Sequence, residues 1–98
     1  MSYDVSVGTF SGNMTSNVVA MWDEAMPDMN LREMHDKTGY ECLPHLEAGI
    51  SYMAANRHSL EEAHPDRGWG SYGGALAFLI QIADGCKSDL NDTVHISR

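Results

Sequence analysis

The stretch that decides the fold is ALAFLIQIA, residues 75–83, in which Gln81 is the only polar side chain. A helix that is apolar on nearly every side needs to be covered on several sides. The run lies inside a helix predicted over about Ser71 to Lys87, with Lys87 at the negative end of the helix dipole. We therefore expect this segment to be the central helix, with the other elements packed around it.

Outward from this helix, the two ends of the chain predict short β-strands. Apolar side chains take every second position within residues 3–9 and again within residues 93–97, which is typical of strands with one buried face. Gly8, Gly12 and Asn13 are expected to end the first strand. Because an isolated strand leaves its backbone groups unsatisfied, the two strands are expected to pair with each other.

Between the strands the sequence predicts helices. An early helix is expected to start at a cap from Thr15 or Ser16 and to end at Pro27. Three later starts carry a capping-box spacing, in which an Asn, Thr or Ser precedes a Glu by three residues. These spacings lie at residues 30–33, 38–41 and 59–62. Pro44 is tolerated only in a first turn, so the second of these helices is expected to start near residues 41–43.

The fold class predicted from these patterns is α+β. Four to five helices surround a central C-terminal helix, and the N- and C-terminal strands form a small antiparallel sheet. A chain of 98 residues has room for one hydrophobic core, so residues 1–98 are expected to form a single small acidic domain. Its 43% content of hydrophobic residues is far from the composition of a disordered protein.

Composition argues against several classes of function. The net charge is −8 with histidines neutral, and the six basic residues are scattered. Nucleic-acid binding is not expected, because phosphate neutralisation needs clustered Lys and Arg. No stretch approaches the roughly 20 apolar residues of a membrane span, and the N-terminus lacks the pattern of a signal peptide. We expect a cytoplasmic protein in which Cys42 and Cys86 are free thiols.

The most informative segment for function is HPDRGWGSYGG, residues 64–74. It contains the spacing G-x-G-x-x-G, but a dinucleotide site also needs a preceding strand and a parallel sheet, and neither is predicted here. Amides at the start of the last helix can bind an anion beside Arg67, and Trp69 and Tyr72 offer stacking surfaces. The alternative is structural, with glycines that permit a tight turn above a core-filling Trp69.

Other chemistry has weaker signals. Cys42 and His45 are the one close pair of metal ligands, whereas structural zinc sites usually show two such pairs. No nucleophile elbow or paired acids point to catalysis. We predict no catalytic residues, no metal site and no cofactor. The methionine-rich first third suits either core packing or an adaptable partner surface.

Five segments together resemble a known group of proteins. They are the YDV strand start at residues 3–5, NMTSNV at 13–18, TG at 38–39, GWGSY at 68–72 and TVHIS at 93–97. In these the chain resembles a family of short, uncharacterised proteins encoded mainly by tailed bacteriophages and some bacteria. The resemblance spans nearly the whole chain and departs from the family pattern at Gly73, where the family has an acidic residue. The family has no established activity, so the resemblance implies a setting in host cytoplasm.

We therefore expect a non-catalytic accessory protein that binds a host protein or a second copy of itself, as a host-takeover or anti-defence inhibitor does. The alternative is a small-ligand binder, such as a binder of a nucleotide-like signal, with a concave site where the Asn13 turn meets the 68–72 loop. The candidate contact residues for either function are Asn13, Asn17, Arg67, Trp69, Gly70 and Tyr72.

Overall fold

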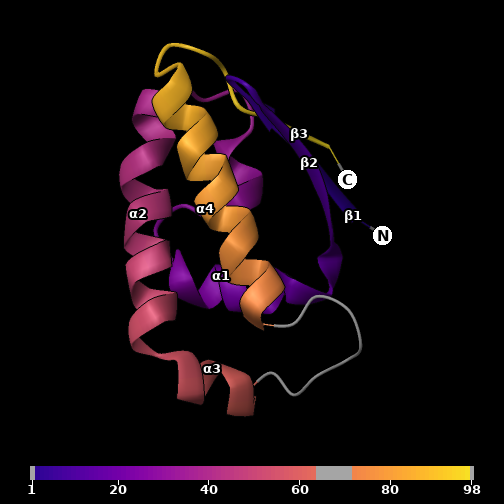
Figure 1. Ribbon diagram of the computed structural model, residues 1–98, viewed down its shortest axis with the longest axis vertical. Helices are drawn as coiled ribbons and strands as arrows, with labels where there is room; N and C mark the ends of the chain where they lie inside the picture. Colours follow the sequence, from indigo (N-terminus) through magenta and orange to yellow (C-terminus); the bar gives the residue numbers. More distant parts are fainter. Residues whose placement is uncertain (1, 64–71, 98) are drawn as a thin grey trace.

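A three-stranded antiparallel sheet lies along one side of a layer of helices in the computed structural model, which describes residues 2–63 and 72–97 (Figure 1). The predicted α+β class is confirmed. The described elements are β1 (Ser2–Val7), β2 (Phe10–Thr15), the 3-10 helix η1 (Ser16–Val18), α1 (Val19–Ala25), the 3-10 helix η2 (Leu31–Met34), α2 (Gly39–Ala55), α3 (Arg57–Ala63), α4 (Tyr72–Ser88) and β3 (His95–Ser97).

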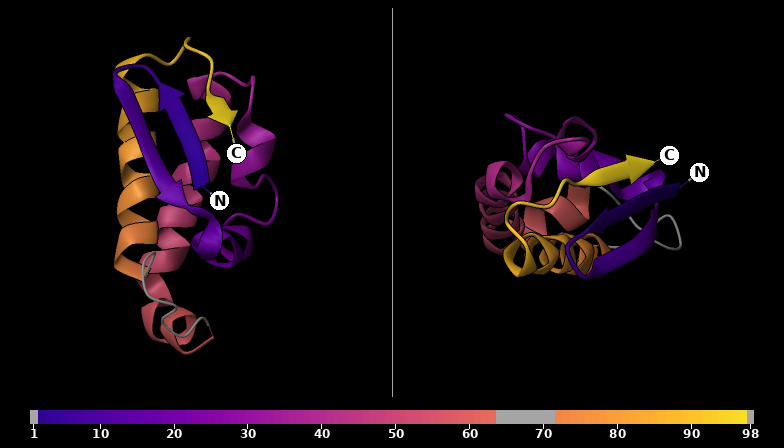
Figure 2. Two further views of the ribbon diagram at one scale, coloured as in Figure 1. Left: turned by 90° about the vertical axis from the view of Figure 1, so that its right-hand side faces the viewer. Right: turned by 90° about the horizontal axis from the view of Figure 1, so that it is seen from above.

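Strand β1 is the middle strand, with β2 on one side and β3 on the other. It pairs with β3 from Asp4 opposite Ser97 to Ser6 opposite His95, so the two ends of the chain meet in one sheet. It pairs with β2 over six uninterrupted positions, from Ser2 opposite Thr15 to the pair that flanks the hairpin turn. Figure 2 shows helices α2 and α4 behind this sheet.

The prediction that Gly12 and Asn13 end the first strand is wrong, because both lie inside β2. The chain turns at Gly8 and Thr9 and returns as a second strand. Gly8 has a φ of 58°, and a Cβ there would lie 2.3 Å from the carbonyl oxygen of Gly85, so the turn needs glycine. The Gly8 amide also donates a 2.7 Å hydrogen bond to Oδ2 of Asp92, which anchors the turn.

Two of the three predicted capping boxes are confirmed. Asn30 with Glu33 starts η2, and Thr38 with Glu41 starts α2, each with both reciprocal hydrogen bonds. The third is wrong, because α3 begins at Arg57 and Ser59 lies within it.

Two other expectations about helix starts are also wrong. Helix α2 begins at Gly39, ahead of the expected 41–43, because the Thr38 box fixes its start; Pro44 therefore lies inside the helix. The N-cap position of α1 belongs to Val18, which makes no side-chain cap, because the one-turn helix η1 leads directly into α1. The Thr15 hydroxyl instead donates to Oδ1 of Asn17.

The core lies between the sheet and the helices and is centred on Trp22, which is 1% exposed. The Trp22 ring stacks on Phe78 of α4, with ring centroids 5.7 Å apart, and meets the edge of Tyr3 of β1. Its Nε1 donates a 3.1 Å hydrogen bond to the carbonyl oxygen of Ala75. Helix α4 packs against α1, α2, α3 and both strands of the hairpin. None of the helices in the described ranges is both long and apolar enough to cross a membrane.

Candidate functional site

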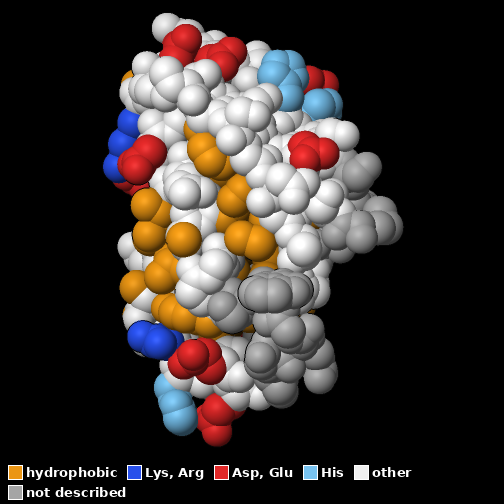
Figure 3. Space-filling view, turned by 45° about the vertical axis from the view of Figure 1, so that its right-hand side comes forward, with side chains coloured by type: hydrophobic (Ala, Val, Ile, Leu, Met, Phe, Trp, Pro, Cys, Tyr) orange, Lys and Arg blue, Asp and Glu red, His pale blue; other side chains and the backbone are white. Residues whose placement is uncertain are grey.

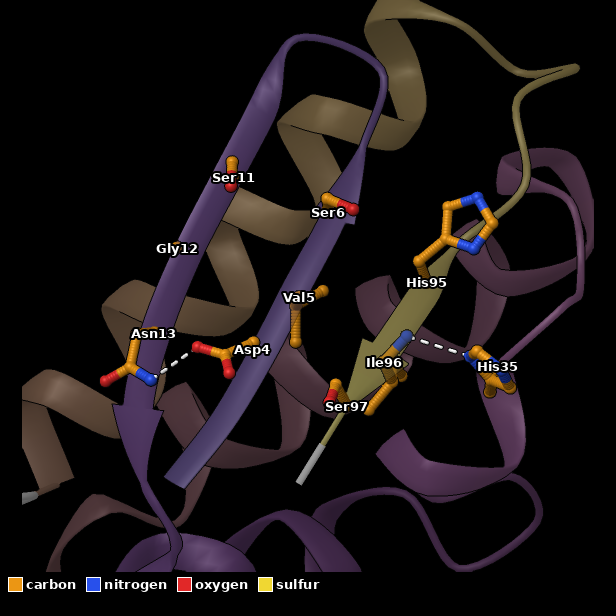
Figure 4. A pocket seen from close by; sticks show the side chains of 10 residues that line it. All are labelled: Asp4, Val5, Ser6, Ser11, Gly12, Asn13, His35, His95, Ile96 and Ser97. Atoms are coloured by element: carbon orange, nitrogen blue, oxygen red, sulfur yellow. Dashed lines mark hydrogen bonds between the residues drawn. The ribbon is translucent and has the colours of Figure 1, made fainter. Parts of the chain in front are cut away.

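The outer face of the sheet, away from α4, is polar and slightly hollowed. Alternate side chains of all three strands point outward there, and His35 joins them from the segment that follows η2 (Figure 4). The polar side chains that line the hollow, of about 490 Å³, are Asp4, Ser6, Ser11, Asn13, His35, His95 and Ser97. This face has enough donors and acceptors to hold a small polar ligand.

Asn13 lies on this face as one member of a cross-strand pair. Its Nδ2 donates to Oδ1 of Asp4 at 2.6 Å and to Oγ of Ser2 at 2.9 Å. Asn13 and Asp4 are directly opposite in the β1–β2 register. Asn13 therefore stabilises the hairpin and does not cap the first helix.

His35 closes the other edge of the sheet. Its Nδ1 accepts a 2.9 Å hydrogen bond from the backbone amide of Ile96. The amide of Asp36 donates to the carbonyl of Val94, and the amide of Val94 donates to the carbonyl of Lys37, each at 2.8 Å. Asp36 reaches this position with a φ of 68°, in the left-handed region that few side chains other than Asn and Asp adopt. Residues 36 and 37 therefore pair with Val94, just before β3, and the ring of His35 covers the outer amide of Ile96 within β3.

His35, Asp36 and His95 are the only described residues whose ligand atoms cluster as a metal site would require, within 4.8 Å of one another. The hydrogen bonding of His35 disfavours a metal there. A metal-bound imidazole normally donates a hydrogen bond from its second nitrogen, but Nδ1 of His35 accepts one. The neutral ring therefore carries its proton on Nε2, which faces Oδ1 of Asp36 at 3.5 Å. His35 therefore contacts Asp36 through Nε2 and the His95 ring edge-on, while its Nδ1 bonds the backbone of Ile96.

The described ranges hold a few candidate nucleophiles and bases, which include Ser6 and His95 on the outer sheet face and the thiols of Cys42 and Cys86. His95 stands opposite Ser6 across the β1–β3 pair, but no hydrogen bond joins them, and Asp4 is bonded to Asn13. Burial raises the pKa of Cys42 to about 12 and that of Cys86 to about 11. Both thiols therefore stay protonated near neutral pH and are poor nucleophiles.

A second surface, on the side of α4 and β2, is apolar. Figure 3 shows hydrophobic side chains gathered over α4 and along its junction with the sheet. We name this surface the α4–β2 face and define it by its exposed and partly buried apolar residues Phe10, Met14, Leu76, Ala77 and Ile80. The side chain of Ile80 is 41% exposed, although isoleucine is usually among the most buried residue types.

The structure does not bring the described candidate residues into one site. Asn13 points to the outer face of the sheet, whereas Tyr72 is 7% exposed and donates a 2.6 Å hydrogen bond to the carbonyl of Met53. Asn17 is exposed and follows β2. Tyr72 thus joins α4 to α2 and offers little of its ring for stacking. The other three candidates, Arg67, Trp69 and Gly70, lie outside the described residues.

Sequence reasoning missed Ser6, Ser11 and Ile80 as surface residues that line the hollow or the α4–β2 face. The sequence did contain a signal for Ser11, because apolar residues or glycine alternate with polar residues along residues 10–15, as in a strand with one exposed face. Ile80 had no such signal, because it is one residue of an almost uniformly apolar run. Comparison of the chain with protein-family models, curated proteins and solved structures gave no match.

Proposed function

We propose that the protein is a non-catalytic protein-binding module whose contact surface is the α4–β2 face. The observation that carries this proposal is the lack of charge over β2 and the first part of α4; beyond it, Ile80 lines one pocket with Glu47, Asp84 and Lys87, which form a charged rim. Along α4 the exposed positions at Gly73, Ala77, Ile80 and Gln81 are uncharged, and the first charged residue of the helix is Asp84. The whole of β2 is uncharged as well.

This pattern contrasts with the rest of the surface. One residue in five of the chain is charged, and helix α3 alone exposes Arg57, Glu61 and Glu62. The cores of protein–protein interfaces are depleted in charged residues, and contiguous exposed apolar patches on small proteins mark interaction sites. A partner protein would remove Ala77 and the apolar side chains of β2 from water without desolvating a charge, and it would meet the charged rim only beside Ile80.

The resemblance to short phage proteins favours a role in host cytoplasm, where the partner is a host protein or a second copy of this chain. In this proposal the protein acts by occupying a surface of its partner, as an inhibitor of a host defence or regulatory factor does. The thiols of Cys42 and Cys86 are buried, and their raised pKa values keep them protonated near neutral pH, so neither is poised to act as a nucleophile.

The test is a charge placed in the middle of the face. Tagged protein is expressed in its bacterial host, purified gently and examined intact by native mass spectrometry. We expect a stoichiometric protein partner, either a host protein or a second copy, which Ala77→Glu removes. Ala48→Glu is the matched control, because Ala48 is also an exposed alanine within a long helix, α2. Absence of any protein partner, or equal loss of the partner in both variants, would contradict the proposal.

The hollow on the outer sheet face favours a second candidate function, the binding of a small ligand. Its only side chain with a fixed charge is Asp4, so a neutral polar or cationic ligand suits it better than a phosphate-bearing one. Ser6→Tyr would fill the hollow, and Thr15→Tyr would add the same ring on the same face beyond the residues that line it. A small mass retained by the wild type and by Thr15→Tyr, but lost from Ser6→Tyr, would support ligand binding.

A further inference from the structure

One edge of the sheet is hydrogen-bonded to a neighbouring segment, and the other edge is open within the described residues. Along the outer edge of β3, residues 36 and 37 make two backbone hydrogen bonds to Val94, which leads into the strand, and the ring of His35 accepts from the amide of Ile96. The edge at β2 has no partner strand among the residues that the structure describes. An open edge presents a row of unpaired amides and carbonyls to any strand that approaches it.

Strand β2 also lacks the features that usually protect an open edge. Natural edge strands are commonly short, carry charged side chains or proline, or contain a bulge. The sequence FSGNMT of β2 has no charge and no proline, and its six positions pair with β1 without a bulge. This edge is therefore suited to pairing with another strand.

The hairpin geometry shows which groups of β2 are available. A two-residue turn at Gly8 and Thr9 makes the flanking pair, Val7 with Phe10, a hydrogen-bonded pair. Hydrogen-bonded and non-hydrogen-bonded pairs alternate along an antiparallel ladder. The amides of residues 10, 12 and 14 therefore face β1, and those of residues 11, 13 and 15 face the open edge.

We propose that the open edge of β2 pairs antiparallel with β2 of a second copy of this chain, about a twofold axis at Gly12. The proposal rests on the proposed function, because it uses the α4–β2 face. With Gly12 opposite itself, Phe10 of one copy stands opposite Met14 of the other on the helical side. On the polar side, Ser11 stands opposite Asn13. The two three-stranded sheets would then continue as one sheet of six strands.

The amino-acid pattern selects this register. A shift by one residue would place outward side chains opposite inward ones along the whole pair, because side chains alternate with a period of two. Gly12 suits the axis, since it has no side chain to meet its own copy. A Cβ there would already lie 2.6 Å from the Phe10 ring within one copy.

The distribution of charge favours a second copy of the chain as the partner at the β2 edge. Each copy carries a net charge of −8, so two copies repel least where they meet on a surface that carries no charge. The β2 edge and the adjoining exposed positions of α4 up to Gln81 are such a surface. A basic partner protein would find no acidic side chain on this surface to pair with, whereas a second copy brings no like charges together.

Helix α4 would take part in the same contact, because it lies directly beneath β2. A Cβ at Gly85 of α4 would be 2.8 Å from Cβ of Phe10, and a Cβ at Gly74 would be 3.6 Å from Cε of Met14. The apolar residues of β2 thus rest on α4 and extend its uncharged surface toward the second copy. This adds apolar burial to the backbone hydrogen bonds of the strand pair.

The oligomeric state is tested first, by sedimentation equilibrium of the full chain. A dimer is expected for the wild type and a monomer for Ser11→Pro, because proline removes an amide that faces the open edge and leaves the ladder to β1 intact. Circular dichroism checks that Ser11→Pro is folded. A monomeric wild type, or a folded Ser11→Pro that remains dimeric, would overturn the proposal.

The register is tested by disulfide formation between two single variants, Ser11→Cys and Asn13→Cys, one of them tagged. The native thiols at Cys42 and Cys86 are buried and do not compete. We expect the mixed disulfide to exceed either self-disulfide several-fold, because residues 11 and 13 stand opposite each other in this register. Equal yields of the three products would overturn it, and so would an excess of a self-disulfide.

These results separate the two proposals. A monomeric protein that binds a host protein in native mass spectrometry, with loss in Ala77→Glu but not in Ala48→Glu, would refute the dimer and support the proposed function. A monomer without any partner would refute both.

Discussion

The backbone amide of Ile96 donates a hydrogen bond to Nδ1 of His35, 2.9 Å away in space and 61 residues away in the sequence. The ring extends a row of contacts in which Asp36 and Lys37 bond the backbone of Val94. The His35 side chain thus adds one more hydrogen bond to the two backbone bonds at Val94. This contact fixes the end of the chain to the segment after η2.

Removing this ring is expected to loosen the C-terminal strand. In His35→Ala the amide of Ile96 loses its acceptor, and the free energy of unfolding should fall by about 1 kcal/mol, the usual net worth of one hydrogen bond. Urea denaturation near neutral pH measures it. His95→Ala is the control, since His95 is exposed beside His35 but accepts no such bond; a surface change of this kind stays within about 0.5 kcal/mol. Equal effects in the two variants would count against the role of the His35 bond.

The fold could be predicted from the sequence where local chemistry decides it. The capping boxes at Asn30 and Thr38 are confirmed, because each is set by four consecutive residues. Strand β2 was missed because Gly12 and Asn13 are typical turn residues, and only pairing with β1 makes them strand residues. The alternation of residues 10–15 is a local signal for this strand, but turn residues in its middle hide it unless the pairing with β1 is known.

Tyr72 offers a direct test of whether a sequence-predicted contact residue is structural. Tyr72→Phe removes the hydroxyl that donates to the carbonyl of Met53, and the free energy of unfolding should fall by about 1 kcal/mol. Partner binding in native mass spectrometry should be unchanged, because the ring is buried. Tyr40→Phe is the control, since the Tyr40 side chain is 69% exposed and its hydroxyl should not affect stability. Loss of the partner from folded Tyr72→Phe would restore Tyr72 as a contact residue.

The buried thiols predict slow labelling of the native protein. At about pH 8 a thiol with a raised pKa has little thiolate, and burial also blocks the reagent. Cys42 and Cys86 should therefore react orders of magnitude more slowly with a thiol reagent in the native state than in denaturant. Absorbance of the released chromophore measures both rates. Fast labelling of either cysteine under native conditions would show that the core around it opens readily.

The raised pKa values of Cys42 and Cys86 also predict a loss of stability at alkaline pH. The pKa values of Cys42 and Cys86 are raised in the folded state to about 12 and 11, above the ordinary value of 9.0. The stabilising contribution is complete below pH 9 and is lost as the pH rises toward the folded values, because the unfolded chain ionises first. The double variant Cys42→Ala, Cys86→Ala should show a shallower decline in this range. If the double variant loses stability in alkali as steeply as the wild type, the loss comes from groups other than the two cysteines.

The candidate surfaces were harder to predict than the fold. The hollow joins side chains from β1, β2, β3 and the turn at His35, and no spacing in the sequence relates these segments. The lack of charge along residues 73–81 is visible in the sequence, but it also fits a fully buried helix. Only the exposure of Ala77 and Ile80 in the structure shows that one side of this helix faces solvent.

The Thr38–Glu41 capping box predicts a loss of stability in acid, in contrast to the loss in alkali that the two cysteines predict. The Glu41 carboxylate accepts hydrogen bonds from the amide and hydroxyl of Thr38, which lower its pKa below the usual 4.5. Its contribution to stability is therefore present above pH 4.5 and is lost as the pH falls through the folded pKa. Glu41→Gln should flatten this acid limb, whereas Asp23→Asn, at an exposed acid of α1 outside any cap, should leave it unchanged.

The other half of the box is the Thr38 hydroxyl, whose loss is expected to lower stability at neutral pH. Thr38→Ala removes the acceptor for the Glu41 amide and should lower the free energy of unfolding by about 1 kcal/mol at neutral pH, as loss of an N-cap usually does. Urea denaturation of both variants, near neutral pH and again below pH 4.5, measures the two contributions. Since Thr38 also bridges to Thr93 beside the C-terminal strand, an effect well above this range would show that the cap supports the sheet as well as α2.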